Sequence, residues 1–180
     1  MKSKASEIRA RIFKTAWGWC AIGVTGKGLA RLVIPEGRGK EELAGFIGGA
    51  VQGGSRRAAK AITDYFAGRV RAFKIPVDFA GLTSFERAVC SEVAKIPYGR
   101  TRSYGDIARR IGRPGAARAV GTAVAKNPLP IVIPCHRVVR SDGGLGGFSS
   151  RAGVATKKKL LDFEKRNKGQ TQNYGAQDWV

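Results

Sequence analysis

Cys135 and His136, the only histidine of the chain, are adjacent within the stretch from Ile131 to Val139. A thiol beside an imidazole is typical of nucleophilic sites, because the imidazole can accept the proton that leaves as the thiolate forms. The apolar run before the pair predicts a buried strand, which Pro130 and Pro134 would make rigid. We therefore treat Cys135 as a candidate nucleophile. The alternative is a buried structural cysteine next to a surface histidine.

The charge of the chain points to a polyanionic partner. Its 180 residues include 33 Lys and Arg against 13 Asp and Glu, a formal net charge of +20. Such an excess favours nucleic acid first and an anionic membrane surface second. The stretch from Lys95 to Lys126 holds eight basic residues against a single acid, Asp106, and is the candidate nucleic-acid surface. No apolar run approaches the ~18 residues of a membrane span, so no membrane partner is predicted.

The three cysteines, Cys20, Cys90 and Cys135, form an odd number without a CxxC spacing. With one histidine in the chain, this pattern does not favour a structural zinc site, and no metal is predicted. The start of the chain has no apolar core typical of a signal peptide, so a reducing, cytoplasmic setting is expected. Cys20 and Cys90 lie on apolar faces and are interpreted as structural.

The residue pattern at the start of the chain predicts a small sheet with helices. Strand-forming residues at 17–24 and 29–35 flank a glycine-containing turn, which is the signal of a hairpin. Helices are expected at 41–51, weakly, and at 56–67, whose apolar stripe includes Tyr65 and Phe66. Residues 1–10 are expected to be loosely packed.

The second half of the chain is predicted to be helical, with a boundary near residue 80. Thr83 or Ser84 can cap one helix and Ser103 a second, and helices at 116–126 and 154–166 follow. The two helices joined by a glycine-containing turn at 112–115 form a helix-turn-helix pattern. The second of them has mainly small side chains, which let a helix lie close to a groove, and Arg118 is the long side chain near its start.

Several motifs, in this order and with this spacing, resemble the O6-alkylguanine-DNA alkyltransferase family, the methylated-DNA–protein-cysteine methyltransferases. The resemblance covers residues 60–166. It is carried by Tyr65 to Gly68, Ile96 to Gly105, Ala117 to Gly121, Asn127-Pro128, Ile133 to Val139, Gly147 to Ser149 and Leu160 to Glu164.

The resemblance implies that Cys135 accepts an alkyl group from O6-alkylguanine once and irreversibly, with O4-alkylthymine as a second candidate substrate. His136 would act as a base through a bridging water, with Glu164 behind it, and Asn127 would fix the turn beneath the cysteine by hydrogen bonds. No cofactor is implied. The partner would be double-stranded DNA that carries the alkylated base, and the protein would act as a monomer.

The resemblance also implies how the base is reached, because a lesion inside a duplex must be flipped out of the stack. Arg118 would then occupy the place of the flipped base in the stack. The residues that would bind the extruded base are Tyr104, Pro130, Val138, Phe148 and Ser149. The residues that would contact DNA are Arg118, Tyr104, Arg102, Ala117 and Arg137. Phe148 stands where the family usually has tyrosine, so the ring is retained but its hydroxyl is lost.

The fold implied is α/β, in two domains. Residues 1–80 would form a small antiparallel sheet with helices, similar to ribonuclease H, and 81–166 a helical, winged-helix-like DNA-binding domain. Residues 167–180 are expected to form a mobile tail. Two other functions fit part of the pattern: a non-catalytic protein that binds alkylated DNA, and a cysteine hydrolase built on Cys135, His136 and Glu164.

Overall fold

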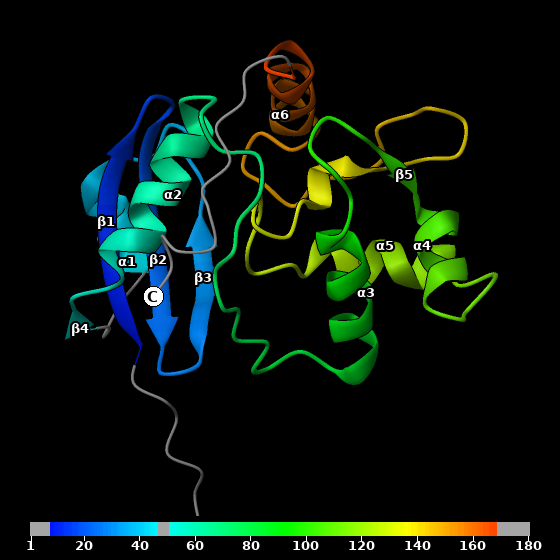
Figure 1. Ribbon diagram of the computed structural model, residues 1–180, viewed down its shortest axis with the longest axis horizontal. Coiled ribbons are helices and arrows are strands. Elements are labelled where there is room, and N and C mark those ends of the chain that lie inside the picture. Colours follow the sequence, from blue (N-terminus) through cyan, green and yellow to red (C-terminus); the bar gives the residue numbers. More distant parts are fainter. Residues whose placement is uncertain (1–7, 47–50, 169–180) are drawn as a thin grey trace, which may run out of the picture. The chain divides into compact units, whose positions relative to one another are not determined.

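The computed structural model describes residues 8–46 and 51–168, and the chain separates into two compact units (Figure 1). One unit ends at Ala80 and the other begins at Gly81. Most of the predicted tail, 167–180, lies outside the described residues. Across the described ranges, no helix is long and apolar enough to cross a membrane.

The first unit is built on a small sheet with the order β3-β2-β1-β4. Strands β1 (Arg9–Thr15), β2 (Gly18–Thr25) and β3 (Gly28–Val33) are antiparallel, and the short β4 (Val51–Gln52) runs parallel to β1. The predicted hairpin is confirmed as β2 and β3. The expectation that residues 1–10 pack loosely is wrong for its last two residues, because they begin β1.

Two helices pack on this sheet. Helix α1 (Lys40–Phe46) contacts β1 and β2, and α2 (Arg56–Phe66) packs on β1. Ser55 caps α2, because its hydroxyl accepts a hydrogen bond from the backbone N–H of Ala58 at 3.1 Å. Tyr65 and Phe66 are buried at the end of this helix. Together with the second unit, these elements make a mixed α/β fold, as predicted.

Three helices of the second unit pack against one another: α3 (Ser84–Ala94), α4 (Tyr104–Arg110) and α5 (Ala117–Ala125). A capping box lies at the N-terminus of α3 and another at that of α4. Thr83 exchanges hydrogen bonds with Glu86, and Ser103 does the same with Asp106, so orphan N–H groups of each first turn are satisfied. Helices α4 and α5 form the predicted pair joined by a glycine-containing turn.

The remaining elements of the second unit surround the candidate nucleophile. The 3-10 turn η1 (Cys135–Arg137) leads into β6 (Val138–Val139), which pairs in parallel with β5 (Arg102–Ser103). Helix α6 (Val154–Arg166) packs on η1 and has the predicted bounds. The start of α4, directly after β5, is thereby placed next to the segment that carries Cys135.

The predicted strand before Cys135 is wrong: residues 131–133 form turns. The backbone N–H of Val132 donates to Pro130 O at 2.9 Å, and that of Ile133 donates to Leu129 O at 2.8 Å. Ile131 has a φ of 65°, a value that a β-branched residue rarely adopts. The apolar character of the run therefore reflects burial of a compact turn, and the local hydrogen bonds replace those of a sheet.

Candidate functional site

Cys135 lies at the start of η1 and is 6% exposed. Its backbone N–H donates to Ile133 O at 2.7 Å, so the turn before it fixes its position. Burial raises the pKa of the Cys135 thiol, although a hydrogen bond from Asn127 and the charge of Lys157 oppose this change. The resting side chain is therefore a thiol, and it needs a base to become a thiolate.

His136 and Glu164 form a fully buried pair, with 2.8 Å between Nε2 and Oε1. Burial lowers the pKa of His136 and outweighs the opposite effect of Glu164, so the imidazole is neutral. A carboxylate only accepts hydrogen bonds, so we assign the imidazole hydrogen to Nε2. Nδ1 is then an acceptor, and among the described residues this buried atom has no hydrogen-bond partner.

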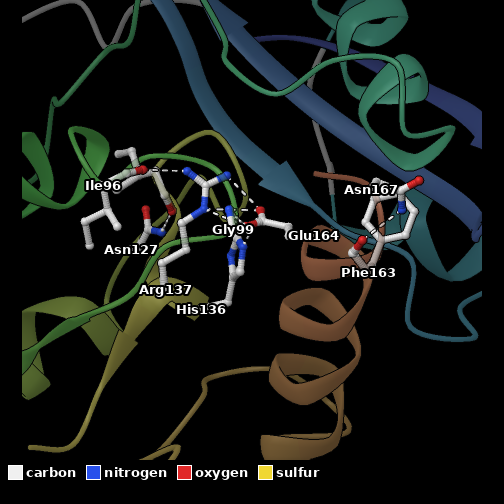
Figure 2. Close-up of polar contacts among 9 residues, drawn as sticks. Ile96, Gly99, Asn127, His136, Arg137, Phe163, Glu164 and Asn167 are labelled. Atoms are coloured by element: carbon white, nitrogen blue, oxygen red, sulfur yellow. Dashed lines mark hydrogen bonds and ion pairs between the residues drawn. The ribbon is translucent and has the colours of Figure 1, made fainter. Parts of the chain in front are cut away.

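Glu164 also binds Arg137, as Figure 2 shows. The Arg137 guanidinium donates from Nη2 to Oε1 at 2.7 Å and from Nε to Oε2 at 2.9 Å, and its Nη1 donates to Ile96 O at 2.6 Å. The backbone N–H of Gly99 donates to Oε2 at 2.8 Å. Burial alone would raise the pKa of Glu164, but His136 and Arg137 lower it to about 2. The carboxylate thus joins α6, η1 and the turn after α3.

Asn127 holds the turn that precedes the cysteine. Its Nδ2 donates to Ile133 O at 2.8 Å, and its Oδ1 accepts from the backbone N–H of Leu129 at 3.0 Å. These two bonds satisfy groups at both ends of the 129–133 turn, in a segment where prolines remove several backbone donors. Asn127 therefore links the end of α5 to the backbone directly before Cys135.

A second set of contacts gathers around Tyr104, the first residue of α4. Lys157 on α6 is fully buried, and its Nζ lies 5.7 Å from the centroid of the Tyr104 ring. The same Nζ donates to Val138 O at 2.6 Å and to Gly147 O at 3.3 Å. Gly146 has a φ of +69°, and a Cβ there would lie 2.8 Å from Tyr104 Oη. The loop before α6 is thus packed against Tyr104.

The other predicted base-binding residues differ in exposure. Val138 is fully buried and Phe148 half-buried, whereas Ser149 is exposed in the loop before α6. Pro130 is half-buried in the turn that Asn127 holds.

The predicted DNA-contacting residues divide into two groups. Arg118 is exposed in the first turn of α5, and Ala117 and Arg102 are half-buried. Arg137, in contrast, is 4% exposed and its guanidinium is bound by Glu164 and Ile96 O. Its assignment to the DNA-contacting set is therefore corrected: Arg137 is an interior partner of Glu164.

Lys157 was not predicted, although helical periodicity contains a signal for it. It lies three residues before Leu160 and seven before Glu164, and all three are fully buried on one face of α6. Lys157 is the first of three consecutive lysines, and such a run is usually a solvated face.

Among the described residues, no group of three or more His, Cys, Asp or Glu side chains could hold a metal ion.

Residues 84–166 match the family described as 6-O-methylguanine DNA methyltransferase, DNA binding domain. The chain is 49% identical over 105 residues to the inducible methylated-DNA–protein-cysteine methyltransferase of Bacillus subtilis, covering 58% of this chain and 57% of that protein. It is 45% identical over 112 residues to the enzyme of the same name from Methanosarcina barkeri, covering 62% and 69%. The match thus spans little more than half of the Bacillus relative.

Solved structures match over more of the chain. A crystal structure of Mycobacterium tuberculosis OGT in complex with DNA is 35% identical, with a TM-score of 0.75, and covers 88% of this chain and 94% of that one. The O6-methylguanine-DNA methyltransferase of the archaeon Pyrococcus kodakaraensis is 26% identical, with a TM-score of 0.60, covering 87% and 98%. The likeness to solved structures is therefore not confined to the segment that the family description matches.

Proposed function

This chain belongs to the methylated-DNA–protein-cysteine methyltransferase family, and from that premise we propose that it repairs O6-alkylguanine in double-stranded DNA. The alkyl group moves to Cys135 Sγ, once per molecule. One observation carries the proposal. Cys135 directly precedes a neutral, buried His136, whose Nε2 is held by Glu164 and whose Nδ1 has no partner among the described residues. That arrangement leaves one nitrogen of the imidazole able to take a proton.

The transfer begins with the thiol of Cys135. Its proton passes through one water molecule to Nδ1 of His136, and Glu164 stabilises the imidazolium that results. The thiolate sulfur then bonds to the alkyl carbon as the bond from that carbon to O6 breaks. The electron pair of the broken bond stays on the guanine, which takes up the proton that the imidazolium of His136 gives back, so that His136 is neutral again. The thioether that forms is stable, so the molecule is consumed.

The base is reached by flipping it out of the duplex, which costs a few kcal/mol of stacking and pairing. We propose that Arg118, exposed at the start of α5, enters the stack in its place, and that Arg102 and Ala117 lie against the DNA. The extruded base would be bound by Tyr104, Pro130, Val138, Phe148 and Ser149. Burial raises the pKa of Tyr104, and a thiolate at Cys135 raises it further, so the Tyr104 hydroxyl stays protonated and can donate a hydrogen bond.

The fold class of each domain, the oligomeric state and the cellular compartment are also proposals. The domain of residues 1–80 would be ribonuclease-H-like and that of 81–166 winged-helix-like, with the α4–α5 pair as its DNA-binding part. We propose a monomer, because the whole proposed catalytic set lies on one chain. A reducing compartment such as the cytoplasm would keep Cys135 as a thiol. O4-alkylthymine is the second candidate substrate class.

Two other functions make different predictions. A protein that binds alkylated DNA without repairing it needs no nucleophile, whereas this chain places Cys135 beside His136. A cysteine hydrolase would use the same three residues but would turn over repeatedly, and the basic helix pair would have no role in it.

The deciding experiment is mass spectrometry of the protein after incubation with a duplex oligonucleotide that contains O6-methylguanine. We expect one methyl group, on the peptide that contains Cys135, and an equal loss of the lesion from the DNA. Cys135→Ala should bind the duplex and acquire no methyl group. Repeated turnover, or methylation of Cys20 or Cys90, would contradict the proposal.

A further inference from the structure

The turn of residues 96–99, which follows α3, contacts both members of a buried ion pair. Its Ile96 carbonyl accepts a hydrogen bond from Arg137 Nη1 at 2.6 Å, and its Gly99 N–H donates to Glu164 Oε2 at 2.8 Å (Figure 2). Arg137 and Glu164 are both buried. Hydrogen bonds to charged groups are stronger than those between neutral groups, so the backbone of this turn holds both charges firmly.

Tyr98 adds a third contact from the same turn. The Cζ atom of Arg137 lies 5.5 Å from the centroid of the Tyr98 ring, within the range of a cation–π contact. A planar guanidinium binds an aromatic face through its plane and binds hydrogen-bond acceptors through its edge. The ring of Tyr98 and the two edge partners, Ile96 O and Glu164, therefore fix the orientation of the Arg137 guanidinium.

The N–H of Gly99 points at Glu164 in a backbone conformation that favours glycine. Its φ is +64°, in the left-handed region. A Cβ at this position would overlap the side chain of Lys168, which follows α6. Both the backbone angle and the packing of Lys168 therefore require glycine where the turn reaches the carboxylate.

The orientation of Glu164 decides which nitrogen of His136 can accept a proton. Its Oε2 binds the N–H of Gly99 and Nε of Arg137, and its Oε1 lies 2.8 Å from His136 Nε2. In a neutral imidazole only one nitrogen carries hydrogen, so Nε2–H facing the carboxylate leaves Nδ1 as the acceptor. If the carboxylate could rotate, the tautomer with hydrogen on Nδ1 would be populated. That tautomer cannot take the proton of Cys135 at Nδ1.

We propose that Tyr98 and Gly99 are positioning residues for alkyl transfer, which hold the buried ion pair so that Nδ1 of His136 stays the proton acceptor. This inference rests on the proposed function, since it concerns the base of that same reaction. Both residues act through Arg137 and Glu164, and not on the alkyl group. The consequence is that a change in the 96–99 turn alters the imidazole itself, beyond any effect on stability.

The tautomer of His136 can be observed directly, because it is the only histidine of the chain. The test is a nitrogen-15 NMR spectrum of the full chain, labelled at histidine and without DNA, at pH 7.5. Burial lowers the pKa of His136, so the imidazole is neutral there. The spectrum distinguishes a ring nitrogen that carries hydrogen from one that does not. Single-turnover methyl transfer from a duplex with O6-methylguanine is measured on the same samples.

Two substitutions disturb the turn independently. Tyr98→Leu removes the aromatic face from Arg137, whereas Tyr98→Phe keeps it. Gly99→Ala turns the N–H away from Glu164, because an L side chain is strained at this φ. The matched control is Gly81→Ala: Gly81 is exposed and also has a positive φ, +87°, and nothing lies within 4 Å of a Cβ added there. Circular dichroism and thermal unfolding establish that each variant is folded at the temperature used.

We expect wild type, Tyr98→Phe and Gly81→Ala to show a single tautomer, with hydrogen on Nε2 of His136. Tyr98→Leu and Gly99→Ala should show a mixture in which hydrogen is also found on Nδ1. Methyl transfer should slow by roughly tenfold or more in these two variants, because the base is then both misprotonated and misplaced. Tyr98→Phe and Gly81→Ala should repair at close to the wild-type rate.

A folded Tyr98→Leu or Gly99→Ala that keeps the wild-type tautomer overturns the inference, whatever its stability, since a purely structural role predicts that result. A changed tautomer with the wild-type rate of methyl transfer also overturns it, as does a mixture of tautomers in Gly81→Ala. If one of the two variants does not fold, the other decides. If neither folds, Tyr98→Met, which fills the space with a flexible side chain, repeats the measurement.

The proposed function fails separately, if the wild-type protein acquires no methyl group on Cys135. The NMR spectrum needs neither DNA nor repair, so the tautomer of His136 is measured in either case. The two failures are therefore distinguishable.

Discussion

His136 Nε2 lies 2.8 Å from Glu164 Oε1, and both side chains are completely buried. Glu164 also accepts hydrogen bonds from Arg137 and from the backbone of Gly99. The carboxylate that orients the imidazole therefore also neutralises a buried guanidinium. Its loss should affect folding as well as chemistry, so variants of Glu164 need a stability measurement beside any assay of repair.

Glu164→Gln should destabilise the protein by roughly 3–5 kcal/mol, because it leaves the buried charge of Arg137 uncompensated. The measurement is denaturant unfolding, followed by the rate of methyl transfer at a temperature where the variant is folded. The matched control is Asp162→Asn on the same helix, whose partner Lys158 is largely exposed. An exposed pair contributes about 0–1 kcal/mol. Equal losses in the two variants would contradict a stabilising role for the buried pair.

The stability contributed by Glu164 should depend on pH below 4.5. His136 and Arg137, against the effect of burial, lower its pKa from 4.5 unfolded to about 2 folded, so the unfolded state binds more protons between these values. The contribution, about 3 kcal/mol, is complete above 4.5 and is lost as pH falls towards 2. The difference in unfolding free energy between wild type and Glu164→Gln should shrink over this range. A difference that stays constant from pH 6 to pH 2.5 would contradict this pH dependence of the Glu164 contribution.

Local sequence signals are sufficient to predict the positions of most helices. Thr83 and Ser103 start helices where their capping pattern predicts, and the apolar spacing of the last helix predicted 154–166. These features depend on neighbours within a few residues of one another. The adjacency of Cys135 and His136 likewise made the candidate nucleophile visible without a structure.

Features that depend on distant contacts were missed. The turn at 131–133 is fixed by Asn127, and neither its hydrogen bonds nor the positive φ of Ile131 follows from an apolar run. The resemblance assigns Arg137 to the DNA-contacting residues, whereas its interior partners, Ile96 and Glu164, lie too far away in sequence to be inferred from its neighbours. Lys157 was missed for the same reason, since a lysine is buried only where the fold supplies carbonyls to receive it.

Arg118→Ala should leave stability within about 0.5 kcal/mol of wild type, because the side chain is exposed. Repair of duplex O6-methylguanine should slow at least about tenfold, since the flipped state loses the group that replaces the base. Reaction with a free-base analogue should be much less affected. Arg113→Ala, which removes another exposed charge from the turn before α5, serves as the control. Equal slowing on the duplex and the free base would contradict insertion by Arg118.

Gly146→Ala tests the packing of the loop against Tyr104. Gly146 and Gly143 both have positive φ, at +69° and +83°, so alanine at either position should cost about 1–2 kcal/mol of backbone strain. At position 146 the new Cβ would also lie 2.8 Å from Tyr104 Oη, whereas at position 143 nothing lies within 4 Å. The difference between the two variants therefore isolates the contact with Tyr104.

We expect Gly146→Ala to lose a further ~1–3 kcal/mol beyond Gly143→Ala, as overpacking typically costs. Methyl transfer should slow at least about tenfold in Gly146→Ala, because either the loop or the Tyr104 ring must move. An increase of about 1.4 kcal/mol in the activation free energy is enough for a tenfold loss of rate. Gly143→Ala should repair at close to the wild-type rate. Denaturant unfolding and single-turnover methyl transfer measure the two effects. Equal rates in the two variants would mean that the contact between Tyr104 and the loop does not position the base.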